Sequence, residues 1–177
     1  MAILNIPDQN KTIENFNEVK DFLHQHGIFL TTWEAQKPIK DSDTQETILE
    51  AYAHELKPFM EKNGFLTADV INVHKDTPNI EAIRAKFLKE HTHSEDEVRF
   101  FVDGEGLFWF HLQDQKGNDL VVNVLCQKGD FMSVPKGYKH WFDLAPKYHV
   151  KAIRIFTNIE GWVAHYTESG IDARYNP

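Results

Sequence analysis

Cysteine is almost absent from this sequence, and the long apolar runs of a membrane protein are missing. Cys126 is the only cysteine among 177 residues, so no disulfide can form within the chain and a reducing compartment is expected. It lies in the apolar run 121–126, which favours a buried hydrophobic residue over a catalytic thiol. No segment has the roughly 18 apolar residues that span a bilayer, and the N-terminus lacks a basic, apolar signal sequence. These absences predict a cytoplasmic protein that does not act in a membrane.

Positive charge is also scarce. Nineteen Lys and Arg residues oppose 27 Asp and Glu residues, which gives a formal net charge of −8. This balance argues against nucleic acid or an anionic membrane as the main partner. Internal repeats, low-complexity segments, linkers and assembly motifs such as heptads are missing too. We therefore expect a monomer with one domain spanning residues 1–177.

The first 90 residues contain the apolar periodicity of helices. The pattern predicts Thr12 as the N-cap and Gly27 as the end of the first helix, and Gly64 as the end of the second. The predicted elements are helices over residues 12–23, 43–64 and 79–90 and a short strand over residues 68–74. We expect residues 1–90 to form mainly helical elements that pack outside the rest of the domain.

From His91 onward the pattern changes to short β-rich runs separated by turns. The runs 97–102 and 107–112 flank a glycine-containing stretch, which predicts a hairpin. Further strands are predicted over residues 120–126, 131–134, 140–144, 149–156 and 161–166. Such short, closely spaced strands favour a β-sandwich or barrel over a parallel α/β sheet. The expected fold class is mainly β, with a core at 91–166 and a tail at 167–177.

Metal-ligating residue types gather in the stretch His91-Thr-His93-Ser-Glu-Asp-Glu97. Alternate residues of a strand face the same side, so His91 and His93 point together, and Glu97 keeps their parity unless the polar run 94–96 bends. Neutral imidazoles and a carboxylate suit iron, nickel, manganese or zinc, and an octahedral ion would keep open positions for chemistry. Because a local run cannot surround an ion, a fourth ligand must come from a distant strand. His140, which follows a turn shaped by proline and glycine, is the best candidate.

Each of the two arginines Arg99 and Arg154 has two possible roles. Arg99 shares the parity of Glu97 and either faces a substrate or forms a structural ion pair with Glu95 or Asp103. Arg154 lies in an otherwise apolar strand. Because burying an unpaired guanidinium is costly, Arg154 needs an anion, which is either a carboxylate or a substrate.

Several other residues have ordinary structural interpretations. His24 and His26 repeat the H-x-H pattern at the end of a predicted helix, but without a nearby carboxylate, which indicates a solvated surface. His111 is expected to make a structural hydrogen bond. Phe142 and Trp162, taken alone, are expected in the core.

Together, two segments of the chain resemble the two motifs of the cupin superfamily. The patterns are His91-x-His93-x3-Glu97-x6-Gly104 and Gly129-x5-Pro135-x-Gly137-x2-His140, with Leu144 where an Asn is usual. The resemblance implies a double-stranded β-helix, also called a jelly-roll barrel, with a metal ion inside.

Within the cupins, the run from Glu90 to Phe100 is similar to the acireductone dioxygenases. The same similarity extends to residues 29–35, 140–143, 154–156 and 161–162, so it covers nearly the whole chain. It implies O2-dependent cleavage of 1,2-dihydroxy-5-(methylthio)pent-1-en-3-one in methionine salvage, with one Fe²⁺ or Ni²⁺ per chain. The iron form would yield formate and 4-methylthio-2-oxobutanoate, and the nickel form formate, carbon monoxide and 3-methylthiopropanoate. The sequence does not identify the metal.

The resemblance also implies roles for individual residues. The implied metal ligands are His91, His93, Glu97 and His140. Arg99 and Asp96 would be catalytic, with Arg99 stabilising the substrate anion. The residues implied to line the substrate pocket are Arg99, Arg154, Phe142 and Trp162, and Glu90 would take part in metal incorporation.

Two other functions fit the same residues. One is a cupin isomerase, or another cupin oxygenase, that acts on a small keto or enediol substrate. The other is a metal-dependent small-molecule sensor. The sequence has no DNA-binding helix-turn-helix or other output module, which argues against this function.

Overall fold

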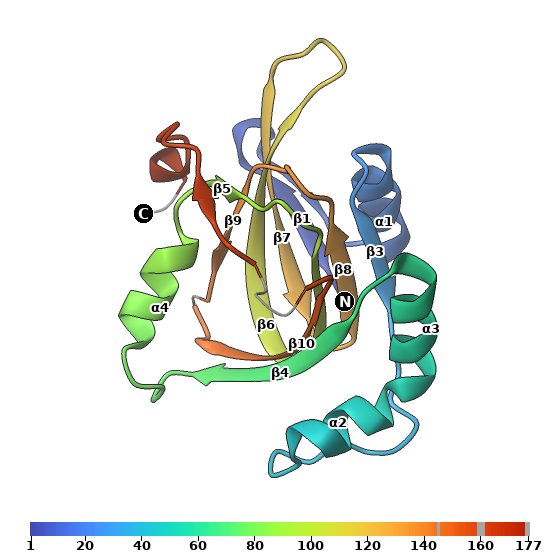
Figure 1. The fold of residues 1–177 in the computed structure, drawn as a ribbon. Coiled ribbons are helices and arrows are strands. Elements are labelled where there is room, and N and C mark those ends of the chain that lie inside the picture. The colour runs from blue at the N-terminus through green and yellow to red at the C-terminus, as the bar shows by residue number, and fades with distance from the viewer. Residues whose placement is uncertain (145, 159–161, 176–177) are drawn as a thin grey trace.

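Two antiparallel sheets, which share one long strand, form the body of the molecule (Figure 1). The computed structural model describes residues 1–144, 146–158 and 162–175. The first sheet runs in the spatial order β11 (His165–Tyr166), β5 (His91–Thr92), β9 (His140–Asp143), β6 (Glu97–Gln113), β7 (Asp119–Gln127), β1 (Ile3–Ile6), β2 (Lys11–Ile13). The second runs β3 (Phe29–Thr32), β8 (Asp130–Val134), β6, β10 (His149–Phe156), β4 (Thr67–His74). This mainly β architecture is the double-stranded β-helix that the sequence resemblance implied.

Strand β6 belongs to both sheets. Its first half pairs with β8 and β10, and its second half pairs with β7 and β9. Gly104 lies where the strand changes partners, with φ of +75°, and a Cβ there would lie 2.0 Å from the carbonyl oxygen of His149. The predicted hairpin over 97–112 is therefore wrong. The glycine allows a bend that carries one strand from sheet to sheet, not a turn that reverses the chain.

The remaining predicted strands are largely confirmed. β7, β8, β9 and β10 match their predicted ranges to within one residue at each end. The strand predicted over 161–166 is reduced to β11, whose two residues pair with β5. Gly161 and the last two residues of the predicted tail lie outside the described residues.

The helices lie outside the sheets, as Figure 1 shows. They are α1 (Phe16–Gln25), α2 (Gln45–Ala51), α3 (Ala53–Asn63) and α4 (Ile80–Phe87), with short 3-10 turns at Pro7–Gln9 and Asp172–Arg174. The predicted cap Thr12 is wrong because Thr12 lies in β2, and Asn15 caps α1 by accepting from the backbone N–H of Asn17 and Glu18. Gly64 ends α3 in a left-handed conformation, as expected.

The N-terminal half also contributes strands that the sequence did not indicate. β1 and β2 extend the first sheet, and β3 forms an edge of the second by pairing with β8. Of the four strands before residue 90, only β4 had been expected. β1, β2 and β3 are short. Strands this short are defined by the strands with which they pair, because their own sequence pattern is too brief to indicate them.

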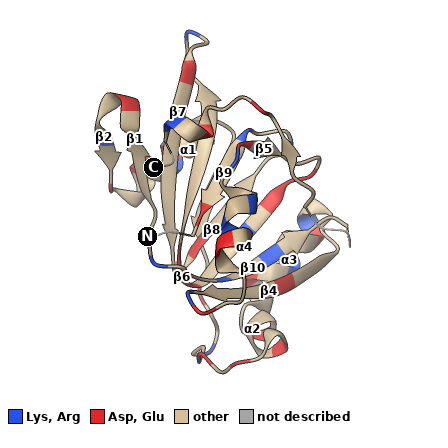
Figure 2. Ribbon diagram, turned by 90° about the vertical axis from the view of Figure 1, so that its left-hand side faces the viewer, with Lys and Arg blue, Asp and Glu red and all other residues tan. Residues whose placement is uncertain are grey.

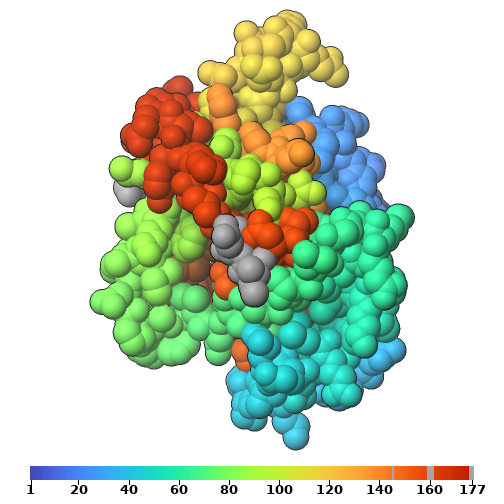
Figure 3. All heavy atoms as spheres, in the orientation of Figure 1, coloured from blue at the N-terminus to red at the C-terminus, as the bar shows by residue number. Residues whose placement is uncertain are grey.

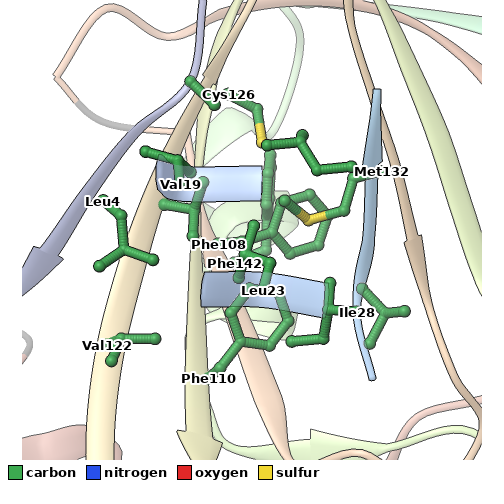
Figure 4. Close-up of a cluster of buried hydrophobic side chains, with 14 of the residues drawn as sticks. Leu4, Val19, Leu23, Ile28, Phe108, Phe110, Val122, Cys126, Met132 and Phe142 are labelled. Carbon is green, nitrogen blue, oxygen red and sulfur yellow. The ribbon is translucent and has the colours of Figure 1, made fainter. Parts of the chain in front are cut away.

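The hydrophobic core fills the space between the sheets and under the helices. Figure 4 shows α1 delivering Val19 and Leu23 against Phe108 and Phe110 of β6. Cys126 is fully buried in the same cluster, and burial raises the pKa of its thiol well above the usual range, as expected of a hydrophobic residue. In the part of the chain that the structure describes, no helix is long and apolar enough to cross a membrane.

Candidate metal centre

Three neighbouring strands of the first sheet, with the residue that follows β5, supply the four predicted metal ligands. His91 in β5 is the direct register partner of His140 in β9, and His140 in turn pairs with Phe110 of β6. Glu97 begins β6, and His93 follows β5. Two motifs more than 40 residues apart in sequence are thus brought side by side by strand pairing.

The four side chains converge in a small buried volume. One ligating atom from each of His91, His93, Glu97 and His140 lies within 4.8 Å of the others, and all four residues are buried. The Nε2 atoms of His93 and His140 both lie 2.9 Å from Oε2 of Glu97. Three imidazoles and one carboxylate are a donor set that first-row divalent metals bind. The residues therefore fit the single metal ion that the sequence predicted.

The backbone orients each imidazole for coordination. Nδ1 of His91 lies 2.7 Å from the carbonyl oxygen of Lys89, and Nδ1 of His140 lies 2.8 Å from that of Tyr138. Nδ1 of His93 lies 2.8 Å from the carbonyl oxygen of Val163. A carbonyl can only accept, so each Nδ1 carries the proton and each Nε2 presents a lone pair to the centre. All three rings are thus held in the tautomer that binds a metal through Nε2.

The charge state of the centre is set by burial and by Glu97. Burial, together with the nearby His140, lowers the pKa of His91 to about 4, so this imidazole is neutral at physiological pH. Burial also disfavours the charged form of His93, but the hydrogen bond and charge of Glu97 outweigh it and raise its pKa. Burial alone would raise the pKa of Glu97, but Arg99 and the two hydrogen-bonded histidines hold it well below its usual range. The carboxylate is therefore ionised.

Arg99 lies beside the ligands on the same inward face. Its Nε donates to Oε1 of Glu97 at 2.7 Å, so neither Glu95 nor Asp103 is the partner in this ion pair. The guanidinium carbon lies 4.9 Å from the ring centroid of Phe142 and 5.1 Å from that of Trp162. Aromatic faces stabilise a cation while leaving its other N–H donors unused. Arg99 is 5% exposed, so its charge acts in a poorly hydrated environment.

A small enclosed cavity of about 110 Å³ opens onto the ligands. Its walls are formed by Phe87, His91, His93, Glu97, Arg99, Phe142, Arg154, Trp162 and Ala164. The pocket residues implied by the resemblance therefore do surround one space. Phe87 and Ala164 were missed, because a phenylalanine on the apolar side of a helix and an isolated alanine carry no functional signal in a sequence.

Arg154 is the register partner of Arg99 on the neighbouring strand β10. Two like charges side by side are unfavourable unless each is compensated. Arg99 pairs with Glu97, and Arg154 makes a bidentate pair with Asp69 of β4, at 2.8 and 2.5 Å. Of the two anions weighed for Arg154, the structure supplies the carboxylate. Its role toward a substrate stays a prediction.

Asp96 lies just before β6, after the bend at residues 94–95, and does not line the cavity at the ligands. It lines a different and larger pocket on the outer side of β3 and β8, near Trp33 and Phe59. Its Oδ1 accepts from the backbone N–H of Lys136, and the neighbouring Gly137 N–H donates to the carbonyl of His93. These two bonds tie together the segments that supply the ligands. The catalytic role that the resemblance implies for Asp96 stays a prediction.

Glu90, next to the ligand His91, is a buried carboxylate with three side-chain hydrogen-bond partners. Its Oε2 lies 2.6 Å from Nδ1 of His111, and its Oε1 accepts from Ser169 Oγ at 2.7 Å and from Thr167 Oγ1. Burial would raise the pKa of Glu90, but these hydrogen bonds outweigh it and lower the pKa. The structural hydrogen bond expected for His111 is confirmed, with Asp119 as a second partner at 2.9 Å. Thr167 and Ser169 had no recognisable signal in the sequence.

A mainly β barrel with three histidines and a glutamate converging in its interior defines a metal-binding cupin. Comparison with known proteins narrows this class. Residues 5–164 match the model of the ARD/ARD' family. The chain is 49% identical to an acireductone dioxygenase of Picosynechococcus sp., covering 99% of this chain and 97% of the relative. It is 43% identical to one of Pseudomonas savastanoi, covering 94% and 89%.

A solved structure agrees with these relatives. The acireductone dioxygenase from Bacillus anthracis, with a cadmium ion in its active centre, superposes with a TM-score of 0.83 at 33% identity. The match covers 94% of this chain and 98% of that one. The chain therefore belongs to the ARD/ARD' family, the acireductone dioxygenases.

Proposed function

We propose that this protein is an acireductone dioxygenase that uses O2 to cleave 1,2-dihydroxy-5-(methylthio)pent-1-en-3-one in methionine salvage. The observation that carries the proposal is the group of three inward-facing Nε2 atoms and one carboxylate beside a buried arginine. Near full-length similarity to acireductone dioxygenases supports the same reaction. His91, His93, Glu97 and His140 would hold one Fe²⁺ or Ni²⁺. When bound, the ion would supply Lewis acidity and a template for substrate and O2.

The protein's own side chains would bind and orient the substrate. An enediol that enters as an anion meets the guanidinium of Arg99, whose N–H groups other than Nε remain for a substrate oxygen. The indole Nε1–H of Trp162 is buried without a partner among the described residues, so it is a second donor in the same wall. Both groups favour a small oxygen-rich anion, with Phe87 and Phe142 covering its apolar part.

The surroundings of the cavity would keep water away from the reacting atoms. Its walls combine aromatic side chains with three of the four ligands, His91, His93 and Glu97, and the space is largely enclosed. In a poorly hydrated site the charge of Arg99 acts more strongly than in water. Phe142 holds Arg99 by contact with its face and so helps to orient it.

The partners we propose are small molecules. In Figure 2 acidic and basic residues are interspersed along the ribbon, a pattern suited to a small-molecule enzyme rather than to nucleic acid. We further propose that the chain acts as a single-domain monomer in the cytoplasm.

The decisive experiment measures products and O2 consumption after loading the metal-free protein separately with Fe²⁺ and Ni²⁺. We expect formate and 4-methylthio-2-oxobutanoate with iron, and formate, carbon monoxide and 3-methylthiopropanoate with nickel. Both reactions should consume O2. Conversion of the substrate at the same rate under strict anaerobic conditions would instead indicate an isomerase and overturn the proposal.

A further inference from the structure

Residues Trp162–Tyr175 form a segment, here called the strap, whose first residues border the metal cavity. Trp162 and Ala164 line the cavity itself, and the carbonyl of Val163 accepts from Nδ1 of His93 at 2.8 Å. The strap continues as β11, which pairs with β5 and so lies beside His91. Figure 3 shows this C-terminal segment, in red, on the surface next to the green residues of α4. The strap thus supplies one wall of the site and one support of a ligand.

Glu90 fastens the strap just beyond β11. Both hydroxyls of Thr167 and Ser169 donate to the same atom, Oε1 of Glu90, and the backbone N–H of Thr167 donates to the Glu90 carbonyl at 3.1 Å. His111 occupies the other carboxylate oxygen at 2.6 Å. Glu90 is 1% exposed, so these contacts are shielded from competing water.

The backbone between the two hydroxyls has an uncommon conformation. Glu168 adopts φ of +56°, in the left-handed region that residues other than glycine rarely visit. Such a conformation persists where the surrounding contacts impose it. Here it turns the chain so that Thr167 and Ser169 face one oxygen atom. The geometry is therefore built around the Glu90 carboxylate.

The far end of the strap is anchored separately. Ile171 packs in a cluster with Trp109 and Trp141, and the ring of Tyr175 lies 5.5 Å from that of Trp109. The part that lines the cavity, Trp162–Ala164, lies on the other side of the Glu90 contact. Its position relative to the ligands therefore depends on β11 and on that contact.

We propose that Glu90 is a positioning residue for the reaction, which acts through Thr167 and Ser169 to hold the strap wall of the cavity in place. Glu90 and His91 are adjacent in an extended segment, so the Glu90 side chain points away from the ligand face. It reaches the site through the strap, which places Trp162 over Arg99 and the Val163 carbonyl on His93. The effect on turnover rests on the proposed function. A role in metal incorporation alone would require the carboxylate but not the two hydroxyls.

The test removes the two hydroxyls and leaves Glu90 intact. In the Ni²⁺-loaded double variant T167V/S169A, we expect backbone amides of residues 162–169 to exchange with deuterium about tenfold faster, because two hydrogen bonds to a charged group are lost. Exchange in the second half of β6 should be unchanged. The KM for acireductone should rise about tenfold with kcat changed less than about threefold, the pattern of lost substrate binding. Wild-type exchange in the strap together with a wild-type KM would overturn the proposal.

Matched variants separate positioning from other effects. Ser169→Thr keeps a hydroxyl at this position. With Thr167 intact, this variant should have near wild-type deuterium exchange in the strap and a near wild-type KM. His165→Gln changes an exposed strap residue and should leave both quantities unchanged. If the double variant does not fold, Ser169→Ala alone should give the same changes at about a third of their size, and their absence would contradict the inference. If the wild-type protein had no acireductone activity, the proposed function would be refuted. The deuterium-exchange measurement would still test whether Thr167 and Ser169 hold the strap in place.

Discussion

Arg99 donates its Nε–H to Oε1 of Glu97, while Oε2 of the same carboxylate faces the Nε2 atoms of His93 and His140. The two oxygens of Glu97 thus have separate partners. Arg99 holds the carboxylate so that one oxygen points to the centre, and Arg99 itself lines the cavity. Arg99 was predicted either to contact the substrate or to pair with Glu95 or Asp103, and the structure shows that it also orients the ligand Glu97.

Replacement of Arg99 should affect catalysis much more than metal binding. For Arg99→Ala we expect kcat/KM to fall by about two to three orders of magnitude, since one charged donor to a developing anion is lost. Metal content at saturating metal should stay near one ion per chain, because the four ligands remain. Steady-state kinetics and elemental analysis on the same preparation measure both. Arg99→Lys keeps the charge but not the planar donor, so its activity should be intermediate; unchanged kinetics in Arg99→Ala would exclude the substrate role.

Loss of one ligand should remove most of the bound metal. We expect His93→Ala to hold less than about a tenth of the wild-type metal after dialysis, because a tridentate residue set binds far more weakly. The matched control is His24→Ala, which breaks the other H-x-H pair, on α1, and should leave the metal content unchanged. Full activity in metal-free His93→Ala protein would refute the metal assignment.

Metal affinity should increase with pH across the neutral range. A ligating imidazole must be neutral, so protons compete with the metal. The pKa of His93 is raised above its usual 6.5, whereas that of His91 lies at about 4 and interferes only in acid. We therefore expect Ni²⁺ affinity to fall as pH drops through the neutral range and to level off above the His93 pKa. Calorimetric titrations at several pH values test this, and an affinity independent of pH between 6 and 8 would contradict it.

Arg154 should matter less to substrate binding than Arg99, because Asp69 already compensates its charge. We expect Arg154→Gln to raise KM less than about fivefold, far below the loss in Arg99→Ala. The ion pair is partly exposed, so a double-mutant cycle with Asp69→Asn should give a coupling of only about 0.5–1 kcal/mol in the free energy of unfolding. Equal kinetic losses for the two arginines would show that both contact the substrate directly.

The bend of β6 should depend on the absence of a side chain at Gly104. A Cβ there would meet the His149 carbonyl at 2.0 Å, and φ is +75°. We expect Gly104→Ala to reduce the free energy of unfolding by about 3 kcal/mol or more, through clash and strain together. Gly117 is the matched control, since its φ is +83° with open space around it. Gly117→Ala should cost about 1 kcal/mol, as measured by denaturant unfolding of both variants.

Local sequence determined the parts of this protein that depend on alternation and on residue type. The parity of His91, His93 and Glu97 predicted their common face, and the β-rich runs from residue 120 to 156 predicted four strands closely. The strand predictions succeeded because a strand places alternate side chains on one side whatever its partners are, whereas Glu97 reaches the ligands across a bend at residues 94–95. His140 was found through its own turn and through the resemblance to a family.

Tertiary structure alone decided which strands pair and which backbone groups support the site. The glycines of β6 permit either a reversal or a bend, and pairing with β8 and β10 on one half and β7 and β9 on the other selects the bend. The support of His93 by the Val163 carbonyl, and the convergence of Thr167 and Ser169 on Glu90, join residues about 70 to 80 positions apart. A backbone carbonyl is the same in every residue, so no sequence pattern can mark the one that holds a ligand.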